Sequence, residues 1–223
     1  MIGRRTWLWG LPALGLSPLL ARAEPSTAQR KLANRIELWS NYARRSRNLM
    51  ARVSTRRETS LLEEPLLSTG TLVFREPGLV VLRDDGRQGS TTLIDGDAIR
   101  VFLNGEGRTG PSTIVADTRP AARWMAQRLV AAFAPGDGTA LVEDCRASVP
   151  KGRGYRLELL PPRGSATRRQ IRSLTLHLDP VAGSITQLSI AETQGDRVVI
   201  ALSDHRQDLP DEDIDAFIEQ LDR

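Results

Sequence analysis

The sequence predicts an α+β fold built on one large, meandering antiparallel sheet. Two observations predict the sheet: short runs of alternating apolar and polar residues recur along the chain, and glycine, proline or aspartate separates one run from the next. A third observation predicts the helices, because three stretches instead space their apolar residues three and four positions apart. Together these patterns indicate one domain of nine or ten strands and two or three helices.

The first 23 residues have the composition of an export signal. They combine Arg4-Arg5, an apolar run of 14 residues that ends at Leu20, and the small-residue exit Ala21-Arg22-Ala23. A membrane-spanning helix needs about 20 apolar residues. We therefore expect a cleaved signal peptide over residues 1–23, a single mature domain over residues 24–223, and a periplasmic location reached by the general secretory or the twin-arginine route. No cysteine follows the expected cleavage point to carry a lipid anchor.

The first half of the mature chain predicts a helix followed by strands. Between residues 27 and 48, Leu32, Ile36, Trp39 and Ala43 form one helical stripe, and from residue 49 onward the period changes to two. An Asp-Gly pair at residues 95–96 predicts a tight hairpin. The expected strands of this half are residues 49–56, 70–74, 79–83, 91–94 and 98–103.

The second half predicts two helices on either side of a run of strands. An amphipathic pattern spans residues 120–133, and a short final helix spans residues 210–221. Leu174, Leu176 and Leu178 alternate with polar residues, which is typical of a strand with one buried face. The expected strands of this half are residues 141–147, 155–160, 171–179, 184–192 and 197–203.

The charge of the chain does not indicate a nucleic-acid partner. The formal net charge is +4, but three of the 31 basic residues lie in the first 23 residues, which leaves 28 basic and 27 acidic residues in the mature chain. A mature chain so close to neutrality lacks the basic field that nucleic-acid binding requires.

The side chains that most often carry catalysis or metals are scarce. The chain has a single cysteine, Cys145, which excludes an internal disulfide. Its only histidines are His177 and His205, and one cysteine with two histidines is too few for a Cys/His zinc site. The stretch Gly105–Gly110 matches a dinucleotide fingerprint, but the residues after it favour extended chain instead of the required helix. We therefore expect no cofactor, no metal and no catalytic residue, and we expect a protein that is not an enzyme.

A curved sheet of this size presents a large apolar face with few helices to cover it. The helices either fill that face as an ordinary core or act as a lid over a cavity for an apolar ligand. The residue pattern alone leaves both alternatives open.

The order of the motifs resembles the LolA family of periplasmic lipoprotein carriers. The resemblance rests on a glycine-led strand that ends near a proline, an Asp-Gly hairpin and a series of later strands, and it covers roughly residues 32–209. The matching stretches are GTLVFREP at residues 70–77, LIDGDAIRVF at residues 93–102, YRLELLP at residues 155–161, residues 171–179 and GSITQL at residues 183–188. Residues 57–68 look like those of LolA-related proteins encoded with lipid- and polyene-assembly enzymes.

This resemblance implies an incomplete antiparallel β-barrel whose concave face is covered by helices that act as a lid. It also implies a cavity that shields the acyl chains of a lipoprotein or related lipid, an inner-membrane donor complex, an outer-membrane acceptor and a monomeric carrier. The candidate cavity residues are Leu72, Phe74, Leu93, Val101, Leu103, Leu157, Leu159, Leu174, Leu176, Leu178, Leu188 and Ile190.

One position departs from the family pattern. The family has an arginine directly before the strand-ending proline, implicated in holding the lid shut, whereas this chain has Glu76 there and Arg75 one place earlier. A shift of one residue reverses the face of a strand, so Arg75 is the candidate lid-control residue only if a bulge restores its direction. The alternative function is a lipoprotein-sensing module of the same fold, like the RseB regulators, although those chains carry a second domain. The related LolB receptor is a lipoprotein, and its lipid-bearing cysteine is missing here.

Overall fold

The computed structural model describes residues 25–45, 47–86, 89–96, 98–103, 113–115 and 119–220. The expected signal peptide and the Gly105–Gly110 stretch lie outside these residues. The helices are α1 (Thr27–Ala43), α2 (Pro120–Phe133), α3 (Thr139–Val142) and α4 (Asp211–Glu219), with a 3-10 turn at Thr167–Arg169. The strands are β1 (Asn48–Glu58), β2 (Leu66–Arg75), β3 (Leu79–Asp84), β4 (Ser90–Asp95), β5 (Ala98–Leu103), β6 (Thr113–Val115), β7 (Arg146–Ser148), β8 (Tyr155–Leu160), β9 (Ile171–Leu178), β10 (Ile185–Glu192) and β11 (Arg197–Gln207).

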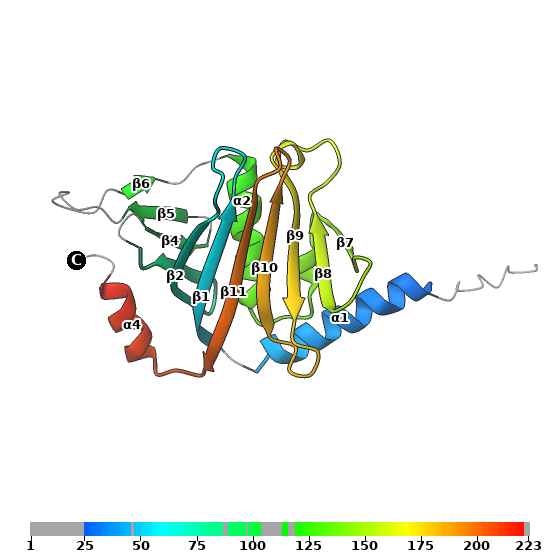
Figure 1. Cartoon of the computed structure of the whole chain (residues 1–223). Coiled ribbons are helices and arrows are strands. Elements are labelled where there is room, and N and C mark those ends of the chain that lie inside the picture. Colours follow the sequence, from blue (N-terminus) through cyan, green and yellow to red (C-terminus); the bar gives the residue numbers. More distant parts are fainter. Residues whose placement is uncertain are drawn as a thin grey trace, which may run out of the picture.

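The described strands form one antiparallel sheet of 11 strands in the order β6-β5-β4-β3-β2-β1-β11-β10-β9-β8-β7 (Figure 1). The order contains two meanders, which are joined where the first strand pairs with the last, for example Val53 with Leu202 and Arg57 with Val198. Within the described residues β6 and β7 are the two edges, so the sheet curves without closing. The predicted fold class, an incomplete antiparallel barrel with helices, is confirmed.

Most of the predicted elements lie within a few residues of their expected positions, but the strand predicted at residues 141–147 is wrong. Gly138, at φ +94°, and Asp137, whose carboxylate accepts from the Thr139 amide at 2.8 Å, begin the short helix α3, and only residues 146–148 pair as β7. An apolar residue such as Leu141 is buried equally well by a helical turn, so its hydrophobicity did not distinguish the two structures.

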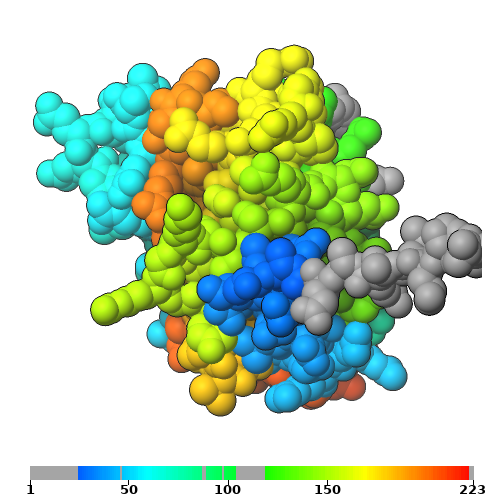
Figure 2. All heavy atoms as spheres, turned by 90° about the vertical axis from the view of Figure 1, so that its right-hand side faces the viewer, coloured from blue at the N-terminus to red at the C-terminus, as the bar shows by residue number. Residues whose placement is uncertain are grey.

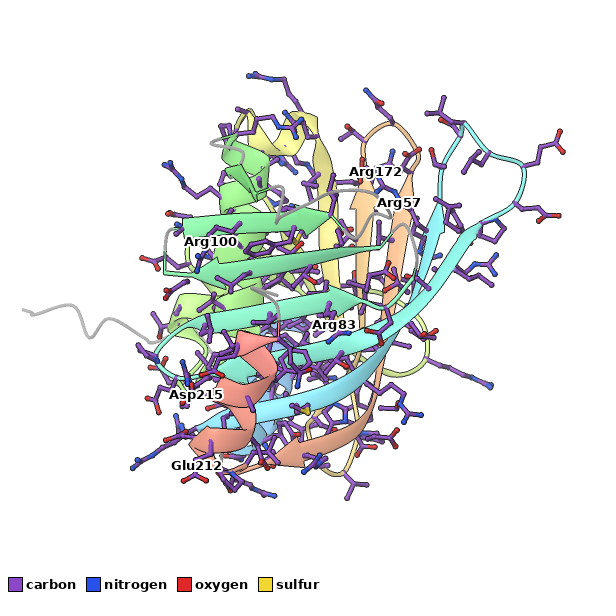
Figure 3. All side chains as sticks on the ribbon, turned by 90° about the vertical axis from the view of Figure 1, so that its left-hand side faces the viewer. Arg57, Arg83, Arg100, Arg172, Glu212 and Asp215 are labelled. Atoms are coloured by element: carbon purple, nitrogen blue, oxygen red, sulfur yellow. The ribbon has the colours of Figure 1, made fainter. Side chains whose placement is uncertain are left out.

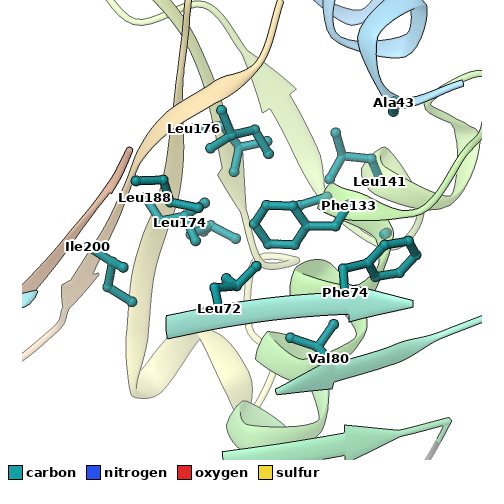
Figure 4. Packing of buried hydrophobic residues seen from close by; sticks show 14 of the residues in the cluster. Ala43, Leu72, Phe74, Val80, Phe133, Leu141, Leu174, Leu176, Leu188 and Ile200 are labelled. Atoms are coloured by element: carbon teal, nitrogen blue, oxygen red, sulfur yellow. The ribbon is translucent and has the colours of Figure 1, made fainter. Parts of the chain in front are cut away.

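The sheet has two faces with separate hydrophobic clusters. The inner face, which carries Leu72, Phe74, Leu174 and Leu176, packs against α1, α2 and α3. Figure 4 shows these side chains pointing toward Phe133 of α2. The outer face carries a smaller cluster of Val73, Val81, Leu93 and Phe102, which is covered by Ile214, Phe217 and Ile218 of α4.

Hydrogen bonds fix the helices on the inner face. A capping box between Ser26 and Gln29 begins α1. Trp39 of α1 is buried, and its indole Nε1 donates to the Ala132 carbonyl of α2 at 2.8 Å. The Ser40 hydroxyl donates to the Gly136 carbonyl at 2.5 Å, which ties α1 to the chain after α2. None of the helices in the described part of the chain is long and apolar enough to cross a membrane.

Candidate functional site

Eight of the twelve predicted cavity residues fill the core in this structure. Their side chains are at most 4% exposed, and they pack in one cluster with Trp124 and Phe133 of α2 and Leu141 of α3. A void of about 10 Å³ beside Phe74 and Phe133 is enough for roughly one water molecule. These eight residues are Leu72, Phe74, Leu157, Leu159, Leu174, Leu176, Leu178 and Leu188.

The other four predicted residues have different surroundings. Ile190 is partly buried against the inner core. Val101 and Leu103 share a side of β5 with Ile99, but Val101 is half-buried and Leu103 is 40% exposed. The expected inner position of Leu93 is wrong. The next residue, Ile94, points inward, so the alternation of β4 directs Leu93 to the outer face beneath α4.

Arg75, the candidate lid-control residue, lies on the outer face. Its Nη1 forms an ion pair with Asp215 Oδ1 of α4 at 2.5 Å, on the opposite side of the sheet from α2. The pairing of β2 with β1 and β3 runs through Arg75 without a bulge, so nothing turns the side chain inward. Its ion pair therefore contacts α4 on the outer face, whereas a role in lid control stays a prediction.

Beyond the packed core, the inner face opens into a groove of about 560 Å³. The groove crosses five strands. It adjoins the core at Val53 and Ile200, which belong to the core cluster and also line the groove. Its floor is mostly apolar and includes Val53 of β1, Leu82 of β3, and Val198 and Ile200 of β11. The lining residues are Val53, Thr55, Arg57, Leu66, Leu67, Ser68, Thr69, Leu82, Arg83, Asp84, Gly86, Gly89, Ser90, Thr92, Val198 and Ile200.

Polar side chains lie at the centre of the floor and at the rim of the groove. Thr55 lies at the centre of the floor, directly opposite Ser68 of β2 and Ile200 of β11. Toward the end of β1 the exposed side chain of Arg57 lines the mouth, and Figure 3 shows it at the same end of the sheet as Arg172. An apolar floor with a cationic mouth suits a ligand that has an apolar chain and an anionic or polar end.

The cysteine and the histidines lie away from this groove. Cys145 is half-buried beside α3, where its thiol donates to the Val142 carbonyl at 3.2 Å and burial raises its pKa. His177, on the outer face, lies 3.3 Å from Gln187 Nε2. His205 donates from Nε2 to the Ile185 carbonyl at 2.9 Å. Throughout the described ranges, no group of three His, Cys, Asp or Glu residues is placed to hold a metal ion.

Sequence reasoning missed most of the groove, although the signal was present. Val53 lies two residues from the buried Ala51 on β1, Leu82 two residues from the buried Val80 on β3, and Val198 two residues from the buried Ile200 on β11, which is the spacing of one strand face. Alternation can assign a residue to a face. It cannot tell which part of that face the helices leave uncovered, because this depends on where α2 crosses the sheet.

Comparisons with known proteins return similar structures at low sequence identity. No family model matches the sequence, and no curated protein matches it. The chain is similar to a LolA superfamily protein from Nitrosomonas europaea, with 15% identity, 84% of this chain and 97% of that chain covered, and a TM-score of 0.43. It is similar to lipoprotein LppX from Mycobacterium tuberculosis, with 10% identity, coverage of 82% and 99%, and a TM-score of 0.40.

A third similar structure is the MucA/MucB complex of Pseudomonas aeruginosa, with 20% identity and a TM-score of 0.37. The match covers 86% of this chain but 60% of that chain. At these identities and TM-scores, no function is carried over from any of the three proteins.

Proposed function

We propose that this chain is a non-catalytic periplasmic carrier that holds an acyl chain of a lipoprotein or related lipid in the inner groove. The single observation that carries the proposal is an apolar-floored groove of about 560 Å³ on the inner face, next to a tightly packed core. That volume lies within the range of small-ligand sites, about 300–1,000 Å³.

The energetics of acyl transfer are compatible with an open groove. Each methylene removed from water contributes about 0.8 kcal/mol, so a carrier must offer apolar surface comparable to that of the membrane. The floor residues Val53, Leu82, Val198 and Ile200 offer such surface. The polar rim leaves one side of a bound chain accessible, which lowers the cost of release to an acceptor. In this proposal, an inner-membrane donor complex loads the carrier and an outer-membrane acceptor unloads it.

A bulky side chain at the centre of the groove tests this function. Thr55 is half-buried on the floor, so Thr55→Trp fills the groove without entering the packed core. We expect at least a tenfold loss of affinity for a fluorescent fatty acid, with little change in thermal stability. The matched control is Ser54→Trp, on the same strand but exposed on the outer face, and it should bind the probe like the parent protein.

Two results would count against the carrier. The parent protein could fail to bind the fatty acid, or Thr55→Trp could bind it as tightly as Ser54→Trp does. A complementary measurement is mass spectrometry of lipids that copurify with the protein from its native cell, in which Thr55→Trp should lack the lipid found with the parent.

A further inference from the structure

Four leucines are exposed at one end of the molecule, around the turn between β1 and β2. Leu61 is 88% exposed, Leu62 48%, Leu66 54% and Leu67 72%. We call these four residues the leucine tip. In Figure 2 the hairpin that carries them stands out from the body at upper left, and in Figure 3 it projects beyond the neighbouring strands. Clustered apolar side chains of this size in water usually mark a surface that contacts something else.

The leucine tip is held in place. The Ser60 amide donates to Asp196 Oδ1 of the β10–β11 turn at 3.1 Å, and β1 pairs with β11 as far as Glu58. On the other side, β3 pairs with β2 only from Gly70 onward, so residues 66–69 extend past their neighbour. The fold therefore exposes the four leucines on a supported hairpin, with Leu66 and Leu67 also at the mouth of the groove.

Arginines lie beside the leucine tip, on its β11 side. The β3–β4 turn, with Asp84 and Asp85, also lies at this end of the sheet. The arginines come from three further segments: residues 56–67, the β8–β9 connection at residues 161–172, and the β10–β11 turn at residues 193–197. They are adjacent because Glu58 pairs with Arg197, and because the Thr193 amide donates to the Gln170 carbonyl at 2.9 Å. Together they contain seven arginines and four acidic residues, in a mature chain with one more basic than acidic residue.

The β8–β9 connection is the most basic of the three segments. It holds four arginines and no acidic residue, and none of the four forms an ion pair within the described part of the chain. These arginines are Arg163, Arg168, Arg169 and Arg172. Arg168 is partly buried and donates to the Arg172 carbonyl, whereas the side chains of Arg163, Arg169 and Arg172 are exposed to an external anion.

The groove opens at the same end. Arg57, Leu66 and Leu67 line its mouth and also belong to the segment that carries the leucine tip. Whatever contacts the leucine tip therefore also lies against the mouth of the groove.

We propose that the leucine tip and the neighbouring arginines dock this end of the protein onto an anionic lipid bilayer, with the leucines entering the headgroup region. Apolar side chains beside basic ones are the combination that binds anionic membrane surfaces. A standard protein interface takes about 20–30 residues a side, many more than this narrow hairpin presents. Docking here rests on the proposed carrier function and deepens it, because it places the groove mouth where an acyl chain leaves or enters the bilayer.

Sedimentation with lipid vesicles tests the docking. The parent protein should bind vesicles that contain phosphatidylglycerol more tightly than vesicles of phosphatidylcholine alone, and added salt should weaken the binding. The double variant Leu61→Ser/Leu62→Ser removes apolar surface without touching the groove lining, and it should bind at least about tenfold more weakly. Val181→Ser is the matched control, because Val181 is also 88% exposed but lies in the β9–β10 turn at the other end of the sheet.

A second pair of variants tests the charge. Arg163→Gln/Arg169→Gln should weaken binding to the phosphatidylglycerol vesicles at least about fivefold and leave binding to neutral vesicles unchanged. Arg206→Gln, on β11 toward the other end of the sheet, should have no effect. Equal binding of the parent protein to both vesicle types, no vesicle binding at all, or full binding by the leucine variant would overturn the proposal. If the parent protein binds no vesicle, the leucine tip would instead be a contact surface for a protein partner.

Docking and acyl binding can fail separately. Leu61→Ser/Leu62→Ser should keep the parent affinity for a soluble fluorescent fatty acid while losing vesicle binding. Thr55→Trp should show the reverse. Vesicle binding in a protein that never binds the fatty acid would preserve the docking surface and reject the carrier function.

Discussion

Arg75 and Asp215 join the last residue of β2 to the C-terminal helix α4, with 2.5 Å between Arg75 Nη1 and Asp215 Oδ1. The pair lies on the outer face, where Ile214 of the same helix is fully buried against Val73 and Val81. Apolar contact therefore holds α4 on the sheet, and the ion pair adds a charged contact at its margin.

Breaking this ion pair should have a small effect on stability. The two side chains are 32% and 58% exposed, and ion pairs this accessible usually contribute about 0–1 kcal/mol. We expect Arg75→Gln and Asp215→Asn each to lower the free energy of unfolding by less than about 1 kcal/mol, measured by urea denaturation. Both variants should bind a fluorescent fatty acid like the parent protein. A large change in affinity for Arg75→Gln alone would support the lid role that the sequence resemblance implies.

A larger side chain at Leu176 distinguishes a filled core from a roomy cavity. Leu176 is 0% exposed and packs beneath α2 and α3. Overpacking such a site costs about 1–3 kcal/mol or more, so Leu176→Trp should lower the midpoint of urea unfolding clearly. Thr175→Trp, the neighbouring residue on the outer face of β9, should change it little. An unchanged midpoint for Leu176→Trp would mean that the core beneath the helices can open to accept a large group.

The strands could be predicted from sequence because their signals are local. In β9, Leu174, Leu176 and Leu178 alternate with half-buried residues, and this pattern alone places them on the inner face. The helix α3 could not be predicted, because a single helical turn and a short strand bury Leu141 equally well. The groove depends on where α2 crosses the sheet, which is set by contacts distant in sequence such as that between Trp39 and the Ala132 carbonyl.

Gly183, in the turn between β9 and β10, lies close to the backbone of α1. Gly183 adopts φ +81°, and a Cβ atom there would lie 2.2 Å from the Leu38 carbonyl oxygen of α1. Gly183→Ala must therefore displace α1 as well as adopt a left-handed backbone, and it should cost at least about 2 kcal/mol. Gly195→Ala isolates the backbone contribution, because Gly195 has φ +101° and a Cβ atom there would have no other atom within 4 Å. It should cost about 1 kcal/mol, and equal costs for the two variants would contradict the contact with α1.

His177 should make the stability of the protein depend on pH in mildly acidic solution. Burial, and then the positive charges of Arg156 and Arg197, lower the pKa of His177 below the usual 6.5. Below about pH 6.5 the unfolded chain takes up a proton that the folded protein resists, so the free energy of unfolding falls as the pH drops toward the folded pKa. His177→Gln should remove this part of the loss between pH 7.5 and pH 5.5 in urea denaturation. Arg197→Gln should reduce it, because one of the charges that oppose protonation is gone. The same pH dependence in His177→Gln as in the parent would assign the loss to other groups.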